Sequence, residues 1–187
     1  MPVRLFSVFL ILVVLATLSA CGGGGNTEGQ DLYNAYRTAE DQRDQAESRL
    51  RQAFADISTA AQAEDRAAVL AAARRGQEAA ADIDRLLATE LEAARGLAAI
   101  EKVSAAAKRL TEGLQQSRDS LALVIKELEI ALDDPFLAHR AKEVNDLAKE
   151  STDVAVKGEL AVRRADRAIA LALGFELRLD QLFTTTG

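Results

Sequence analysis

The fold is decided by residues 100–131, IEKVSAAAKRLTEGLQQSRDSLALVIKELEIA, where apolar residues recur at alternating steps of three and four. The stripe consists of Ile100, Val103, Ala107, Leu110, Leu114, Ser117, Leu121, Val124, Leu128 and Ala131, with Ser117 as its one polar member. Such steps place one stripe along an α-helix, and their average of about 3.5 residues suits long helices packed side by side. This stretch predicts a long amphipathic helix that packs against other helices.

The same spacing continues on both sides of this stretch. Toward the N-terminus it runs through Val69, Ala73, Gly76, Ala80, Ile83 and Leu87, and before that through Leu32, Tyr36, Ala39, Arg43, Ala46, Leu50, Ala53, Ile57 and Ala60. Toward the C-terminus it runs through Val144, Leu147, Ser151, Val154, Gly158, Ala161, Ala165, Ala168, Ala172, Phe175, Leu179 and Leu182. Arg43 is a polar violation of the first stripe, while Gly158 keeps the phase of the last and is therefore expected inside a helix. We expect residues 31–187 to form a single all-α domain.

Two points along the chain carry the residues that begin helices. The apolar pattern fails at residues 61–64, and Asp65 suits the N-cap of a new helix. Asp134 and Pro135 suit the N-cap and first position of the last helix, because a proline there loses no hydrogen bond. Both points are expected to be turns between helices.

The phase of the stripe also slips between Leu91 and Ile100, with Gly96 inside the slip. No Ser, Thr, Asp or Asn directly follows Gly96 to cap a new helix, so one long, locally distorted helix is favoured here and a break is the alternative. The predicted architecture is an antiparallel bundle or extended coil of three long helices, or of four if the middle helix breaks near Gly96.

The N-terminus has the pattern of an export signal. One basic residue, Arg4, precedes an apolar run of 14 residues from Leu5 to Leu18, which is shorter than the ~20 residues of a membrane-spanning helix. The run ends in Leu18-Ser19-Ala20-Cys21, which resembles the lipobox of bacterial lipoproteins. The resemblance implies that residues 1–20 are a signal peptide, that the chain is cleaved before Cys21, and that lipid is attached to the Cys21 sulfur.

Residues 21–30 are then expected to be a lipidated cysteine followed by a flexible, glycine-rich tether. The resemblance further implies that the membrane is a partner through the lipid anchor and that the protein lies in the cell envelope. Because residue 22 is glycine and not the aspartate that marks inner-membrane retention in such lipoproteins, the periplasmic face of the outer membrane is favoured in a cell with two membranes. In a cell with one membrane the expected place is the outer face of the plasma membrane.

The composition argues against several kinds of chemistry. The chain has one cysteine, one histidine (His139) and one methionine (Met1), so a disulfide, a cysteine zinc site, a His–Met haem site and a di-iron site with two Glu-x-x-His pairs are excluded. The net charge of −6 and the absence of a concentrated basic surface argue against nucleic acid as a partner. We expect no catalytic, cofactor-binding or metal-binding residues.

One segment departs from the amphipathic pattern. In residues 169–179, IALALGFELRL, bulky apolar side chains occupy every odd position. The members Leu171, Leu173, Phe175, Leu177 and Leu179 cannot all face one narrow seam if the segment is helical. They are expected to contact a protein partner or a second copy of the chain, and the alternative is that neighbouring helices cover them.

The sequence predicts a membrane-tethered, non-catalytic envelope lipoprotein that acts as a spacer, scaffold or accessory subunit through helix–helix contacts. The alternative is a periplasmic carrier that holds a lipid or other apolar ligand between its helices. A closed seam between the helices would favour the scaffold, and an apolar cavity would favour the carrier.

Overall fold

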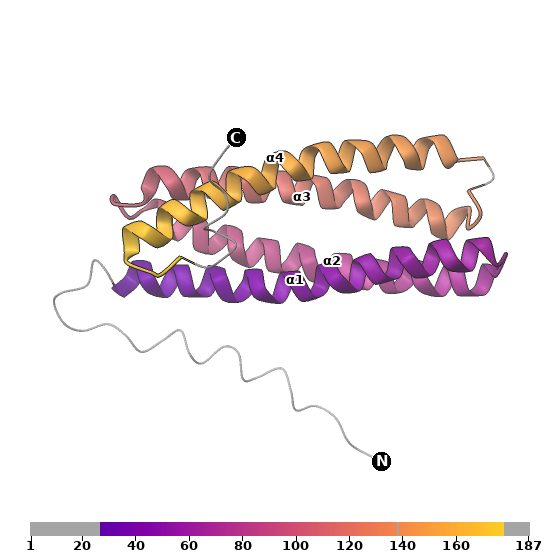
Figure 1. The fold of residues 1–187 in the computed structure, drawn as a ribbon, viewed down its shortest axis with the longest axis horizontal. Coiled ribbons are helices and arrows are strands. Elements are labelled where there is room, and N and C mark those ends of the chain that lie inside the picture. Colours follow the sequence, from indigo (N-terminus) through magenta and orange to yellow (C-terminus); the bar gives the residue numbers. More distant parts are fainter. Residues whose placement is uncertain (1–26, 138, 178–187) are drawn as a thin grey trace, which may run out of the picture.

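The computed structural model describes residues 27–137 and 139–177 as four long helices, α1 (Thr27–Gln62), α2 (Arg66–Ala98), α3 (Ser104–Asp133) and α4 (Ala141–Leu173). Within these residues there is no β-strand, so the prediction of an all-α fold is confirmed. Consecutive helices are joined by short turns and run antiparallel, as Figure 1 shows. Cys21 and Leu179 lie outside the described residues.

The turn between α1 and α2 lies where the sequence predicts it. Glu64 adopts a left-handed conformation with φ of 56°, and the Asp65 carboxylate accepts a hydrogen bond of 3.0 Å from the backbone N–H of Ala68. Asp65 is therefore the N-cap of α2, as expected. At its other end α1 begins at Thr27, so residues 27–30 of the expected tether are helical.

The favoured prediction of one continuous helix through Gly96 is wrong, and the alternative of a break is the one found. Gly96 lies in the last turn of α2, and the chain turns at residues 99–103. The N–H of Ala99 donates to the carbonyl of Gly96, while Val103 at the start of α3 makes no capping bond with its side chain. Leu97 and Val103 are buried instead. Burial of apolar side chains, at roughly 1.5–3 kcal/mol each, stabilises this turn without a polar cap.

The prediction that Asp134 and Pro135 begin the last helix is also wrong. Asp134 is the C-cap of α3, and α4 begins six residues after Pro135, at Ala141. The residue before a proline avoids helical backbone angles, and Asp134 accordingly has a ψ of 80°, which ends α3. The Asp134 carboxylate accepts from the backbone N–H of His139 and so closes the loop between the two helices.

The last helix ends earlier than the apolar pattern predicts. Gly174 has a φ of 83°, which L-residues rarely adopt, and its N–H donates to the carbonyl oxygens of Ala170 and Leu171. Phe175 then leaves the helix axis and packs on Tyr33 of α1, with ring centroids 4.8 Å apart. The prediction of a helix through Leu182 is therefore wrong for the described residues 174–177.

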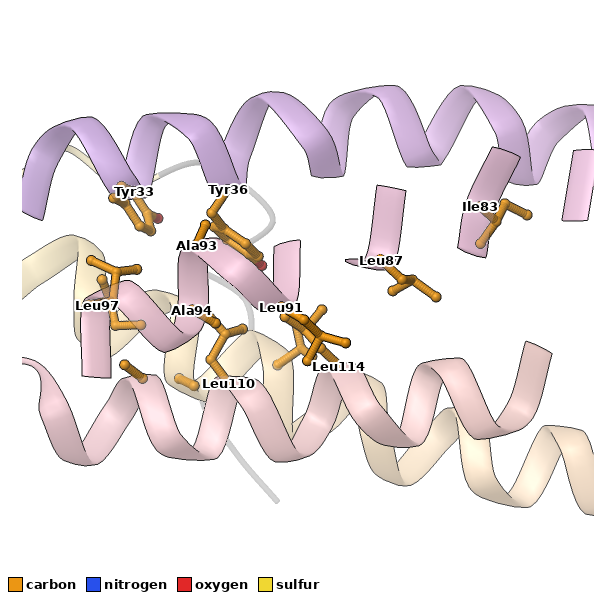
Figure 2. Packing of buried hydrophobic residues seen from close by; sticks show 14 of the residues in the cluster. Tyr33, Tyr36, Ile83, Leu87, Leu91, Ala93, Ala94, Leu97, Leu110 and Leu114 are labelled. Atoms are coloured by element: carbon orange, nitrogen blue, oxygen red, sulfur yellow. The ribbon is translucent and has the colours of Figure 1, made fainter. Parts of the chain in front are cut away.

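The helices form two antiparallel hairpins, α1–α2 and α3–α4, which are joined where α2 packs on α3. The start of α1, the α2–α3 turn and the end of α4 lie together at one end of the bundle, which we call the closed end. There a Cβ on Gly29 would lie 3.0 Å from Leu173 and 3.2 Å from Ile100. Figure 2 shows the core of this end, where Tyr36, Leu91 and Leu114 come from three different helices.

The α3–α4 hairpin is held by a very close approach of two glycines. A Cβ on Gly158 would lie 2.9 Å from the carbonyl oxygen of Gly113, and a Cβ on Gly113 would lie 2.9 Å from that of Gly158. Gly158 is inside α4, as predicted. Because it has no side chain, α3 of the same chain can approach it closely.

Candidate functional site

A groove with a volume of about 1190 Å³ lies between α1 and α4 and is partly open to solvent. It exists because α1 packs on α2 and α4 packs on α3, while α1 and α4 touch at few places. On α1 the lining extends from Glu40 to Arg51, which is about 17 Å at 1.5 Å per residue.

The groove has an apolar floor and polar walls. The floor is formed by Leu50, Ile83, Leu87, Leu121, Val124 and Val162. The walls carry Glu40, Asp44, Glu47 and Arg51 from α1, and Thr152, Glu159, Arg163 and Asp166 from α4. Such a surface is complementary to an amphipathic occupant, whose apolar side would face the floor and whose polar edges would face the walls.

At the closed end, hydrogen bonds join the two walls of the groove. Asp166 of α4 is almost fully buried and accepts from the Tyr33 hydroxyl at 2.7 Å and from Arg37 Nη1 at 2.9 Å. Nearby, the Gln30 side-chain amide donates to the carbonyl oxygen of Leu173. These bonds fix the distance between α1 and α4 at one end and leave the rest of the groove open.

A second buried ionic group lies where α1 meets α2. Arg43 donates from Nε to Oε1 of Glu90 at 2.7 Å, and Glu90 is fully buried. Burial raises the pKa of Glu90 to about 7, although Arg43 opposes the shift. Burial also raises the pKa of Glu40, and it raises the pKa of the Tyr36 hydroxyl well above its ordinary value.

A smaller polar group crosses from α3 to α4 on the floor side of the groove. The Ser120 hydroxyl donates to the backbone carbonyl of Ser151 at 2.9 Å, and Ser151 in turn lies 3.5 Å from Glu127. Burial raises the pKa of Glu127, and the bond from Ser151 opposes this. The group joins the two helices by a buried hydrogen bond.

Some of the predicted partner-contact residues lie in the core of the chain, and one lies on its surface. Leu173 is buried, Phe175 packs on Tyr33, and Leu177 is partly buried against the core. Leu171 is 56% exposed, and Leu179 lies outside the described residues, as does the predicted lipidation site Cys21. Of the four predicted contact residues that the structure describes, three thus belong to the chain's own core and one lies on its surface.

Sequence reasoning missed the groove and its ionic groups, although one sign of them was present. Arg43 interrupts the first apolar stripe, and Glu90 stands three residues after Leu87, at the next step of the second stripe. Two charges of opposite sign at buried positions of neighbouring stripes indicate a pair. The groove itself has no comparable mark, because its floor residues are ordinary members of apolar stripes.

Comparison with protein-family models, curated proteins and solved structures finds no match for this chain. None of the four described helices is both long enough and apolar enough to span a bilayer. Within residues 27–137 and 139–177, no three His, Cys, Asp or Glu side chains are arranged to hold a metal ion. His139 is exposed on the loop between α3 and α4.

Proposed function

We propose that this protein is a membrane-tethered, non-catalytic envelope lipoprotein that acts as a scaffold or accessory subunit, and that it holds a helix of a partner protein in the groove between α1 and α4. The tethering part of the proposal rests on Leu18-Ser19-Ala20-Cys21 at the end of the apolar N-terminal run. It places the protein on the periplasmic face of the outer membrane in a cell with two membranes, and on the outer face of the plasma membrane in a cell with one.

The proposed scaffold function is supported by the shape and lining of the groove. It is partly open to solvent, it is about 17 Å long on α1, and an apolar floor lies between charged walls. An amphipathic helix laid into such a groove buries its apolar stripe and keeps its polar side in water, which is a common mode of helix recognition. About three helical turns would fit along the lined part of α1.

A carrier of an apolar ligand is the second candidate, and the apolar floor is the observation that favours it. Small-molecule sites are usually about 300–1,000 Å³ in volume, mostly apolar, and enclose 70–90% of the ligand. The groove here is larger, has many charged wall residues and is open on one side. The groove is neither the closed seam expected for a scaffold nor the apolar cavity expected for a carrier, and these three differences rank the partner helix above the small ligand.

A photo-crosslinking side chain placed at two adjacent positions tests the scaffold in intact cells. Thr152 is exposed and lines the groove, whereas Asp153 is exposed and does not line it. We expect one discrete protein adduct from position 152 and none from position 153. Equal adducts from both positions, or none from position 152, would contradict a partner in the groove.

Native mass spectrometry of the purified protein tests the carrier. If the protein is a scaffold, we expect to measure the mass of the processed chain alone after mild removal of detergent. A stoichiometric lipid adduct that is lost when Leu121 is replaced by glutamate would overturn the ranking, because Leu121 is a buried floor residue.

A further inference from the structure

The outward face of α4 carries most of the large apolar side chains that the described residues expose. Val156, Leu160 and Leu171 are each at least half exposed, and the only other large exposed apolar residue is Phe136 in the preceding loop. On a helix, Val156 and Leu160 are about 40° apart, and Leu160 and Leu171 about 20° apart. The three therefore form one stripe on the side of α4 opposite to Gly158 and Ile169, which are buried.

Between Val156 and Leu171 the same face is basic and has no acidic residue, while the exposed Asp153 lies one turn before it. Between Val156 and Leu171 it carries Lys157, Arg164 and Arg167, and neither of these arginines forms an ion pair with another described residue. The only acids of this stretch are Glu159, which pairs with Arg163, and Asp166, which is buried toward α1. The face is thus positive although the whole chain has a net charge of −6.

The position of the chain's N-terminus brings this face close to the proposed lipid anchor. Thr27 begins α1 at the closed end, where Gly29 and Gln30 contact Leu173 at the end of α4. Only five residues lie between Cys21 and Thr27, and the six steps from one Cα atom to the other span at most about 20 Å when fully extended. A lipid anchor on Cys21 would therefore hold the end of α4 near the bilayer. This step rests on the proposed function, of which the anchor is a part.

We propose that the outward face of α4 from Val156 to Leu171 lies on the surface of a bilayer that contains anionic lipid. A helix face with apolar side chains beside arginine and lysine binds such surfaces. The apolar side chains enter the headgroup layer, and the cationic side chains are attracted to the anionic lipid headgroups. The groove wall adjoins this face, because Arg163 and Glu159, which line the groove, are about 60° and 100° from Leu160 around the helix.

Cosedimentation of residues 22–187 with vesicles tests the face without the lipid anchor, so failure of one proposal does not imply failure of the other. This chain retains all four helices and every contact described above. The vesicles contain either phosphatidylcholine alone or equal parts of phosphatidylcholine and phosphatidylglycerol, at low ionic strength. We expect binding to the anionic vesicles and much weaker binding to the neutral ones.

Two variants and a matched control locate the binding surface. Arg164→Gln with Arg167→Gln should weaken binding about 25-fold, at about fivefold for each arginine near an anionic surface. Leu160→Ser with Leu171→Ser should weaken it at least about tenfold. Arg66→Gln with Arg74→Gln removes the same charge from exposed positions of α2 and should change binding less than twofold.

Circular dichroism and analytical ultracentrifugation of each variant complete the test. Unchanged helicity together with the losses above supports the proposal. Equal loss in the α2 control, equal binding to neutral vesicles, or unchanged binding of the α4 variants overturns it. A dimer that dissociates in the Leu160→Ser and Leu171→Ser variant would also overturn it, since the face would then be an interface between copies of the chain.

Discussion

Arg43 of α1 donates from Nε to Oε1 of Glu90 of α2 across 2.7 Å, at a point where Glu90 has no exposed surface and the Arg43 side chain is 15% exposed. Charges are seldom so deeply buried, and when they are, each depends on its partner to offset the loss of hydration. The pair lies beside the groove, because Arg43 also lines it. It is therefore both a constraint on helix packing and a part of the candidate site.

Removal of Arg43 should destabilise the protein strongly. At pH 8, where Glu90 is ionised, Arg43→Ala leaves its carboxylate buried and unpaired, which costs about 3–5 kcal/mol in the free energy of unfolding. Arg49→Ala is the matched control on the same helix, because Arg49 pairs with Asp82 in an exposed position and should contribute less than about 1 kcal/mol. Urea denaturation monitored by circular dichroism measures both, and similar losses from the two variants would refute a structural role for the buried pair.

The stability of the protein should fall as pH rises toward neutrality. The pKa of Glu90 is about 7 in the folded chain and 4.5 ordinarily, so the folded state holds a proton that the unfolded state releases. The contribution is fully present below about pH 4.5 and is lost as pH rises through about 7, for a decrease of about 3 kcal/mol. Glu40 titrates in the same direction.

Denaturation at pH 5 and pH 8 measures this dependence. Glu90→Gln should reduce the difference between the two pH values, whereas Glu92→Gln should leave it unchanged, because Glu92 is exposed on the same helix. A wild-type protein that is equally stable at both pH values would contradict the raised pKa of Glu90.

Replacement of Gly158 by alanine should destabilise the α3–α4 hairpin in spite of alanine's higher helix propensity. The added Cβ would meet the carbonyl oxygen of Gly113 at 2.9 Å, and backbone cannot move aside without separating the helices. We expect a loss of about 1–3 kcal/mol. At Gly76 the added Cβ would meet the flexible end of Leu128, so Gly76→Ala should cost clearly less. Thermal melts of the two variants decide the comparison, and an equal or smaller loss at Gly158 would be contrary to it.

Two leucines near the end of α4 should respond very differently to truncation. Leu173 is 2% exposed and lies among core residues, so Leu173→Ala should cost about 2–5 kcal/mol. Leu171 is 56% exposed, and Leu171→Ala should change the stability of the isolated domain by no more than about 0.5 kcal/mol. The melting temperatures of the two variants check this, and a large loss at Leu171 would mean that a neighbouring chain covers it.

Substitution of Cys21 should abolish stable membrane attachment. The thiol is the group that accepts lipid in the lipoproteins whose lipobox residues 18–21 resemble, and two or three acyl chains hold a protein firmly where one does not. Metabolic labelling with a fatty-acid probe should mark the native chain and not the Cys21→Ser variant. Label retained on the variant would refute lipidation at this residue.

The sequence by itself determined the parts of the fold that depend on local periodicity. The alternating apolar steps predicted an all-α fold of long helices, Asp65 marked the start of α2, and the unbroken phase placed Gly158 inside α4. These predictions succeeded because a side chain's position around a helix depends on its number in the chain alone. A capping carboxylate likewise acts on backbone only three residues away.

Only the tertiary structure decided where the helices end and which side of the bundle stays open. The turn at residues 99–103 has no polar cap and is held by burial of Leu97 and Val103, while Asp134 and Pro135 end a helix although their sequence suits the start of one. Likewise, the groove between α1 and α4 exists because segments more than 100 residues apart meet at Tyr33 and Asp166 and then diverge. Contacts over such separations depend on how all four helices pack at once, and no local pattern of residues encodes that balance.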